Sequence, residues 1–408
     1  MSSRLKYIVV STSTCLTLLL LIGSVLGQGA SSDDTYKHIG VFTDVVSRIK
    51  SEYVEEPDMK SVTLGALTGM LEAIDPFASY LNADQYKDYQ KNRDTRRADV
   101  GLILSKKFGY VGVVGVAPGS PAARAGFTTG DMIESIQNVA TRDMPLAYAD
   151  LLLKGDSGSS VELSVVRVQH PEPSSVKLTR ANLTLPAVED QLLAGQVAYL
   201  KPGALTASKV KETEAAIQKA QKQGAQKLII DLRNTAMGEP EDGIAFANLF
   251  LSKGRITYLQ GQRVARQNFE ADPAKAITTL PVVVLTNRGT ADAAEIAASA
   301  LADNHRAELV GERTYGDASQ RRAITMEDGS AIILSVAKYY SADGKAIQDN
   351  AVTPKNQVVQ AEQQVDLDDN GEPLPENPKE PQQQAAPQKK LDEDPMVKKA
   401  LEILGVKV

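Results

Sequence analysis

The spacing of apolar residues predicts a helical region near the start of the chain, over residues 34–95. Apolar side chains recur every three or four positions, as on one face of a helix, over residues 41–53, 61–74 and from 82 into 89. Asp75-Pro76 ends the second helix, because proline cannot continue one. Asn82 is a good N-terminal cap for the third helix.

The pattern changes to short runs of β-branched residues over residues 98–186. These runs predict strands at 100–104, 110–116, 160–168 and 175–178, and the apolar stretch 146–153 predicts a helix. Between the strands, residues 117–133 contain turn residues, a one-turn alanine helix and a strand that follows Gly130-Asp131. This region is therefore predicted to form a separate β domain.

Strands and helices alternate over residues 187–355. The apolar runs predict strands at 197–200, 227–232, 282–286, 308–310 and 331–339, and the helical periods fall at 208–223, 244–251 and 291–302. Such alternation is typical of βαβ units with a partly parallel sheet. The fold class is thus α/β, in a multi-domain chain.

Beyond residue 355 the periodicity ends, and residues 356–393 form a polar, proline-rich linker that is predicted to be disordered. Within it, residues 366–377 resemble the start of a calcium loop. Pro373 and Asn377 occupy positions where that loop needs an apolar residue and a bidentate glutamate, so we expect no calcium site. A short helix is predicted within residues 394–408, with Asp394 as cap, Pro395 first and Gly405 as stop.

The first 27 residues are typical of an export signal. Arg4 and Lys6 precede an apolar run over residues 7–26, and small residues follow it. The run is also close to the ~20 residues that span a bilayer, so a cleaved signal peptide and a retained membrane anchor both stay open. In either case we expect the rest of the chain to be exported, in the periplasm or anchored to the membrane.

Composition excludes several kinds of chemistry. The formal net charge is −6 with no basic stripe, so nucleic acid is not an expected partner. The histidines His38, His170 and His305 are far apart in sequence, and metal ligands cluster, so no metal or other cofactor is predicted. Cys15, the only cysteine, lies in the N-terminal apolar run, which leaves no thiol nucleophile in the exported part.

The turn segment at residues 117–133 resembles the G-S-P-A…A-G…G-D-x-I stretch of PDZ domains. The resemblance implies that a peptide tail pairs with the strand Gly101, Leu102, Ile103 and Leu104 and packs against the following helix, where Leu152 is a candidate contact. The physical basis is β-augmentation, in which unpaired strand amides bind the peptide backbone and a pocket takes an apolar side chain. A PDZ fold kept only as a spacer is the alternative.

Four motifs outside the PDZ segment point to one family. They are Gly65 to Leu81, Asp231-Leu232-Arg233-Asn234, Gly289 to Ile296 and Gly311 to Asp317. Together they resemble the C-terminal processing peptidases (tail-specific proteases), over about residues 41–354. The resemblance implies an α/β core of the crotonase-like ClpP/tail-specific protease type. It also implies serine-type endopeptidase activity from a serine and a lysine.

The chain departs from that family at the residues that carry the reaction. The nucleophile position is Asp292 and the general-base position, 25 residues later, is Asp317. Neither carboxylate can replace a hydroxyl activated by an amine. In the oxyanion region Met237 stands before Gly238 where the family has two glycines, and Arg321 stands where the family has a glutamine. We therefore predict a catalytically inactive member; Ser299 and Ser319 are the other candidate nucleophiles.

Two aspartates at these positions leave three possibilities. An ion-pair network with Arg313, Arg321 or Arg322 is favoured. A cation site between Asp292 and Asp317, or acid–base chemistry with one raised pKa, is the alternative.

The predicted function is an exported pseudopeptidase that binds unstructured protein C-termini without cleaving them. It would serve as adaptor, scaffold or regulator of an active paralogous protease, and the family resemblance implies homo- or hetero-oligomers. The alternatives are an active serine endopeptidase that cleaves protein C-termini, and a structural envelope subunit.

Overall fold

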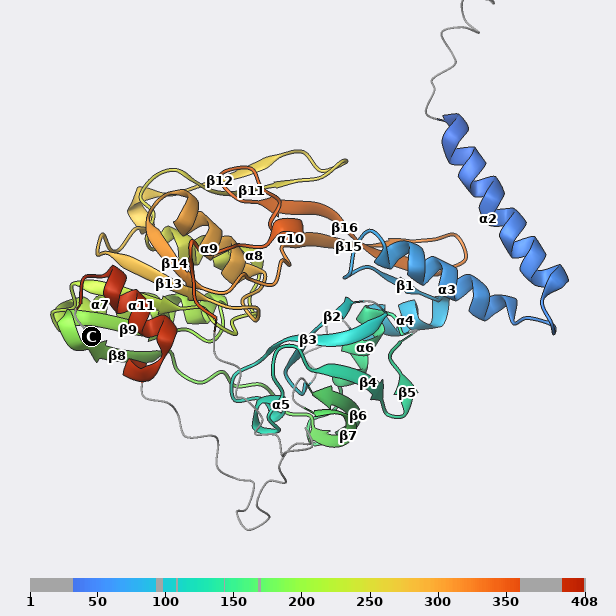
Figure 1. The fold of residues 1–408 in the computed structure, drawn as a ribbon, viewed down its shortest axis with the longest axis horizontal. Helices are drawn as coiled ribbons and strands as arrows, with labels where there is room; N and C mark the ends of the chain where they lie inside the picture. Colours follow the sequence, from blue (N-terminus) through green and yellow to red (C-terminus); the bar gives the residue numbers. More distant parts are fainter. Residues whose placement is uncertain are drawn as a thin grey trace, which may run out of the picture. The chain divides into compact units, whose positions relative to one another are not determined.

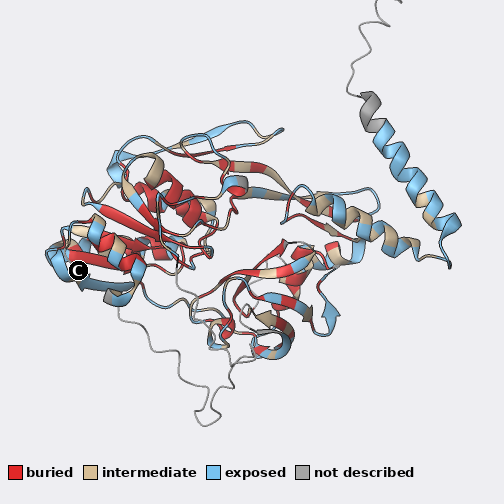
Figure 2. Ribbon diagram, viewed as in Figure 1, coloured by how far each residue is buried: buried red, intermediate tan, exposed pale blue. Residues whose placement is uncertain are grey.

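The computed structural model describes residues 32–92, 98–107, 109–142, 144–167, 170–359 and 391–406 (Figure 1). Residues 1–66 and 67–408 form two compact units. The first contains α2 (Ser32–Glu52), which begins earlier than predicted, and the start of α3 (Met59–Glu72). Most of the described apolar side chains of α2 are exposed (Figure 2), at Ile39, Phe42 and Val45 among others, and Val46 and Ile49 are half-buried. No described helix is long and apolar enough to cross a membrane, and the predicted signal or anchor lies outside the described residues.

The rest of the predicted helical region is joined to the core by hydrogen bonds. Residues 79–81 form a strand, β1 (Ser79–Leu81), which the sequence pattern did not predict and which pairs with β16 (Ala331–Tyr340). α4 (Ala83–Asn92) begins where expected, because Asn82 and Gln85 exchange backbone-to-side-chain hydrogen bonds of 3.0 and 3.1 Å.

The predicted β domain has the expected strands and helix, but β5 was not predicted and β7 begins five residues before the predicted strand 175–178. Its sheet has the order β2-β3-β4-β6-β7, and β5 pairs with β4. The strands and helices are β2 (Leu102–Lys107), β3 (Tyr110–Val116), α5 (Pro121–Arg124), β4 (Met132–Ile136), β5 (Val139–Ala140), α6 (Leu146–Leu153), β6 (Ser160–Arg167) and β7 (His170–Thr179). One apolar core, which includes Val111, Ile133 and Leu153, lies between this sheet and α6.

The core of the second unit has a six-stranded sheet in the order β17-β14-β13-β10-β9-β8. Every pair except β8–β9 is parallel, as predicted for βαβ units. Its strands are β8 (Glu189–Leu193), β9 (Val197–Lys201), β10 (Lys227–Asp231), β13 (Val282–Thr286), β14 (Ala307–Gly311) and β17 (Asn356–Gln357). A second sheet, β1-β16-β11-β12 with β15 on β16, adds β11 (Arg255–Gln260), β12 (Gln267–Glu270) and β15 (Ser319–Thr325).

Helices cover both faces of the six-stranded sheet. α7 (Ala207–Lys222), α8 (Pro240–Asn248) and α9 (Ala293–Asp303) share an apolar core with one face. α8 and α9 touch closely, because a Cβ atom at Gly243 would lie 2.2 Å from the carbonyl oxygen of Ala293. The C-terminal helix α11 (Pro395–Ile403) was predicted within 394–408, and it packs on the other face against Ile229 and Val283. The calcium-like segment 366–377 lies outside the described residues.

Candidate functional site

The candidate site lies where three parallel strands end. The chain leaves β10, β13 and β14 into loops 232–238, 287–292 and 312–317, and ligand sites of parallel sheets form at this edge. Hydrogen bonds hold the first two loops together: Asn287 Nδ2 donates to Asn234 Oδ1 at 2.9 Å, and Thr290 Oγ1 donates to the Leu232 carbonyl at 2.8 Å. The fold therefore brings motifs from distant parts of the sequence to one place.

Asp292 occupies the turn before α9. Its φ of 49° lies in the left-handed region that non-glycine residues seldom adopt, and such strain gathers at functional sites. Its backbone N–H donates to Glu295 Oε2 at 3.1 Å. Its own Oδ1 atom is shielded and has no hydrogen-bond partner among the described residues. Burial, and then the charge of Asp317, raise the pKa of Asp292 well above its usual value.

Glu295 is the buried acceptor that organises the site, and the sequence analysis did not single it out. Its carboxyl group accepts from the backbone N–H groups of Gly316 and Asp317, both at 2.8 Å, from Asp292, and from the hydroxyl of Thr314. It is fully buried, and burial raises its pKa to about 8 in spite of these donors. One side chain thus fixes both predicted aspartates in place.

Asp317 forms an ion pair with Arg321. The guanidinium carbon of Arg321 also lies 4.1 Å from the centre of the Phe77 ring, a cation–π contact. Burial raises the pKa of Asp317, although the charge of Arg321 opposes the shift. Of the other two arginines considered, Arg313 donates to the Asn350 carbonyl at 3.1 Å instead, and Arg322 is exposed.

The alternative of a cation site gains no support from these contacts. Within the described part of the chain, no three His, Cys, Asp or Glu side chains are arranged to hold a metal ion. A protein site for Ca²⁺ or Mg²⁺ needs several oxygen ligands around the ion.

The oxyanion region has an unusual backbone. Gly238 has a φ of 148°, and a Cβ atom there would lie 2.3 Å from the Leu205 carbonyl oxygen, so only glycine fits. The carbonyl of Met237 accepts from Leu205 N at 2.7 Å. Met237, which the sequence analysis placed at a family glycine position, lines a groove that reaches this region.

A groove of about 410 Å³ runs from the β domain to this region. The predicted peptide-binding residues Gly101 to Leu104 line it, together with Met237 and Arg321 of the core. Asp292 and Asp317 do not line it. Leu146, Ala147 and Asp150 of α6 also line the groove, as does Lys154, the residue that follows this helix.

Two features of the groove differ from expectation. Leu152 does not line it; the helix turns residues 147, 150 and 154 toward the groove at helical spacing, and Leu152 packs on the apolar core. The lining also includes an ion pair that the sequence analysis did not predict, between Lys154 Nζ and Asp150 at 2.6 Å, near Asp99. Burial alone would lower the pKa of Lys154, but the charges of Asp150 and Asp99 raise it overall. Burial raises the pKa of Asp99.

The other candidate nucleophiles lie elsewhere. Ser299 Oγ donates to the Ile296 carbonyl at 3.0 Å, within α9, and Ser319 Oγ lies 2.9 Å from Ser335 Oγ. Neither hydroxyl has a hydrogen bond to a lysine, histidine or carboxylate in the described residues. Activation of a hydroxyl requires such a base within hydrogen-bond reach.

Comparison with known proteins agrees with this geometry. Peptidase family S41 matches residues 196–358 and a PDZ domain matches residues 112–167. The carboxy-terminal processing protease CtpA of Bacillus subtilis (strain 168) is 29% identical over 358 residues, 86% of this chain and 76% of that protein. The carboxyl-terminal-processing protease of Synechocystis sp. is 32% identical over 336 residues, 80% of this chain and 77% of that protein.

The chain is a member of peptidase family S41, the C-terminal processing proteases. A solved S41 structure, the photosystem II D1 C-terminal processing protease, matches with a TM-score of 0.63 and 26% identity. The match covers 78% of this chain and 92% of that chain. The predicted family and fold class are confirmed, including the PDZ domain and the S41 core. The groove described above is lined by residues 101–104 of the β domain and by Met237 and Arg321 of the S41 core.

Proposed function

We propose that this S41 protein is a pseudopeptidase that binds unstructured protein C-termini in the PDZ groove and does not cleave them. One observation carries the proposal: the groove beside Gly101 to Leu104 ends on Arg321 and Met237, whereas Asp292 and Asp317 stay behind its surface. A substrate in this groove would meet a guanidinium paired with Asp317. It would not meet a nucleophile activated by a base.

The chemistry of the two aspartates supports the same proposal. Loss of the nucleophile alone is expected to lower turnover by on the order of 10⁶. Glu295 holds the loop of Asp317 through backbone hydrogen bonds, which supports a fixed position for that loop. In this proposal the chain keeps the fold of a protease, but Asp292 and Asp317 do not form a nucleophile–base pair.

The PDZ domain and the family together support the partner class. S41 relatives are named for processing protein C-termini, and the PDZ strand β2 offers the backbone for β-augmentation. We further propose that the chain is exported through residues 1–27, into the periplasm or onto the membrane, and acts as adaptor, scaffold or regulator of an active relative. The competing function is an active serine endopeptidase, and the cleavage assay described below distinguishes the two.

A groove-blocking substitution tests tail binding. We expect Ala147→Glu to weaken binding of a fluorescent, unstructured peptide with an apolar C-terminus about tenfold, because the side chain would project into the groove beside β2. Anisotropy measures the affinity. Ala140→Glu, the same change at an exposed position of β5, is the matched control and should bind like wild type.

Mass spectrometry of an unfolded protein with the same tail tests the absence of cleavage. We expect intact protein after incubation with the wild-type chain, and no labelling of the chain by a serine-reactive probe. Cleavage products that a mock purification lacks would show the chain to be an enzyme. Equal binding by wild type and Ala147→Glu would instead refute the groove as the binding site.

A further inference from the structure

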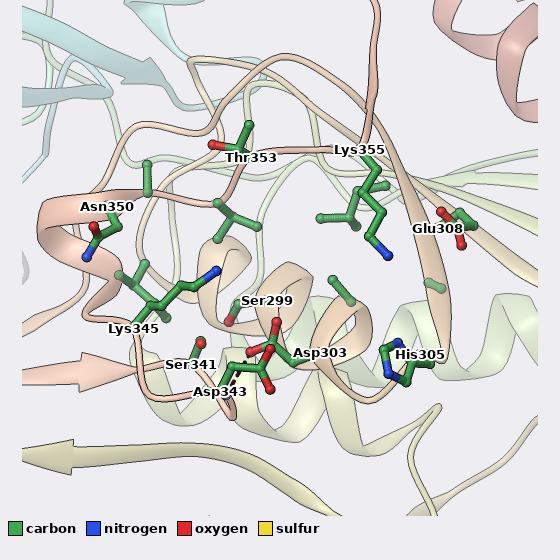
Figure 3. A pocket seen from close by; sticks show the side chains of 16 residues that line it. Ser299, Asp303, His305, Glu308, Ser341, Asp343, Lys345, Asn350, Thr353 and Lys355 are labelled. Carbon is green, nitrogen blue, oxygen red and sulfur yellow. Dashed lines mark hydrogen bonds between the residues drawn. The ribbon is translucent and has the colours of Figure 1, made fainter.

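A second pocket, of about 510 Å³, lies at the carboxyl end of α9 (Figure 3). The last turn of α9, the start of β14 and residues 341–355 form its walls, all within the S41 core. None of its lining residues lines the PDZ groove. Its volume falls within the roughly 300–1,000 Å³ of small-molecule sites.

The inner wall of this pocket combines apolar side chains with one unsatisfied hydroxyl. Ile347 and Val352 are buried and form part of the lining. Ser341 is 6% exposed, and its Oγ atom has no hydrogen-bond partner among the described residues. Figure 3 shows this hydroxyl pointing toward the interior of the pocket. A shielded hydroxyl without a partner is unfavourable, and a polar ligand atom would satisfy it.

Charges of both signs surround the opening. Lys345 and Lys355 lie on either side of α10 (Ile347–Asn350), and both line the pocket (Figure 3). No ion pair joins either lysine to another described residue. Asp303 and Asp343 lie together on another side, where the backbone N–H of Asp343 donates to Asp303 Oδ2 at 3.1 Å. Glu308 is a third carboxylate in the lining, so two amines and three carboxylates line one cavity, and no ion pair joins either amine to a carboxylate among the described residues.

We propose that this pocket binds a small zwitterion, a free amino acid or a short peptide of two to four residues. A simple anion would satisfy the lysines but meet the carboxylates, and a simple cation would meet the reverse conflict. A zwitterion places its carboxylate at Lys345 and Lys355 and its ammonium group at Asp303 and Asp343. The apolar wall at Ile347 and Val352 accommodates a short aliphatic side chain.

The pocket also shares its elements with the candidate active site. α9 begins after Asp292 and ends in this pocket at Asp303. The segment that carries Val352 exchanges hydrogen bonds with Thr314, at 2.8 and 3.0 Å, on the loop that leads to Asp317. The zwitterion site is nevertheless independent of the proposed tail binding, because it uses different residues and requires no peptide in the groove.

Calorimetric titration of the purified full-length chain tests the proposal. The probes are L-alanyl-L-alanine, L-alanine, and N-acetyl-L-alanyl-L-alanine amide, which carries neither charge. We expect a saturable heat with at least one of the first two, and at least tenfold weaker binding of the blocked compound. Whether alanine or alanylalanine binds more tightly identifies an amino-acid or a peptide site.

Variants locate the binding. Lys345→Gln and Lys355→Gln should each weaken the charged probe about tenfold, and Lys211→Gln, an exposed lysine of α7, should leave it unchanged. Ser341→Ala should weaken it about threefold without lowering the melting temperature, since the lost hydroxyl has no partner in the protein. No heat with either zwitterion, equal binding of the blocked compound, or equal binding by both pocket-lysine variants would overturn the proposal.

Discussion

The protein is expected to lose stability as the pH rises from about 5 to 8. The folded state raises the pKa values of Asp292, Glu295 and Asp317, chiefly by burial. Unfolded carboxyl groups ionise near pH 4, so in this range the unfolded chain has released protons that the folded chain still holds. Each rise in pH therefore favours the unfolded state, until the pH passes the folded pKa.

The expected size of this effect is large. A rise in the pKa of Glu295 from 4.5 to about 8 corresponds to on the order of 3–5 kcal/mol of stability lost between those pH values. Hydrogen bonds lower the pKa values of Asp58 and Asp328. These two groups therefore change the stability only below about pH 4, outside this pH range. Denaturant unfolding at pH 5, 6, 7 and 8 measures the free energy of unfolding directly.

The variant Asp292→Asn tests whether the pH dependence of stability comes from the candidate site. Asparagine has the shape of a protonated aspartate, so the variant should match wild type near pH 5 and exceed its stability at pH 8 by about 1–3 kcal/mol. Asp156→Asn, at an exposed position, is the matched control and should leave the pH dependence unchanged. Stability that rises with pH, or a slope that Asp292→Asn leaves intact, would show that Asp292 is readily ionised in the folded state.

The sequence predicted the elements that have strong apolar patterns and missed those held by pairing. β13 was predicted from five consecutive apolar or β-branched residues, with the bounds that the structure has. β15 reads Ser-Gln-Arg-Arg-Ala-Ile-Thr, which has no strand pattern, and becomes a strand because it pairs with β16 along its length. β1 is a similar case, a three-residue strand fixed by β16. Neighbours that are distant in sequence decide such segments.

For the candidate site too, the sequence predicted some features and missed those that depend on distant neighbours. Motif spacing singled out Asp292 and Asp317, but the partner of Asp317 depended on which of Arg321 and Arg322 the β15 register directs toward it. Leu152 does not line the groove, and the sequence could not show this because α6 carries leucines at 146, 151, 152 and 153, so its apolar residues mark no single face. The role of Glu295 came from backbone N–H groups, whose directions no sequence pattern reveals.

Removal of the Arg233 side chain is expected to cause the largest loss of stability. Arg233 is 8% exposed and pairs with Asp231 at 2.5 Å and with Asp394, the cap of α11, at 2.6 Å. Tyr199 donates to the same Asp231 carboxylate at 2.7 Å. Arg233→Ala would leave Asp231 buried without its counter-charge, at a cost of about 3–5 kcal/mol. Urea unfolding of the variant measures the change.

The exposed arginine Arg288 provides the control. Its side chain is 77% exposed and lies 3.7 Å from Glu312, so Arg288→Ala should change stability by less than about 0.5 kcal/mol. Limited proteolysis adds a local readout, since Arg233→Ala also releases the Asp394 anchor of α11 and should speed cleavage near residues 391–406. Equal stability of the two variants would mean that the Arg233 pairs contribute little. If the expected loss is found, the Asp231-Leu232-Arg233-Asn234 motif has a structural role here, because it fastens α11 to the central sheet through the Arg233–Asp394 pair.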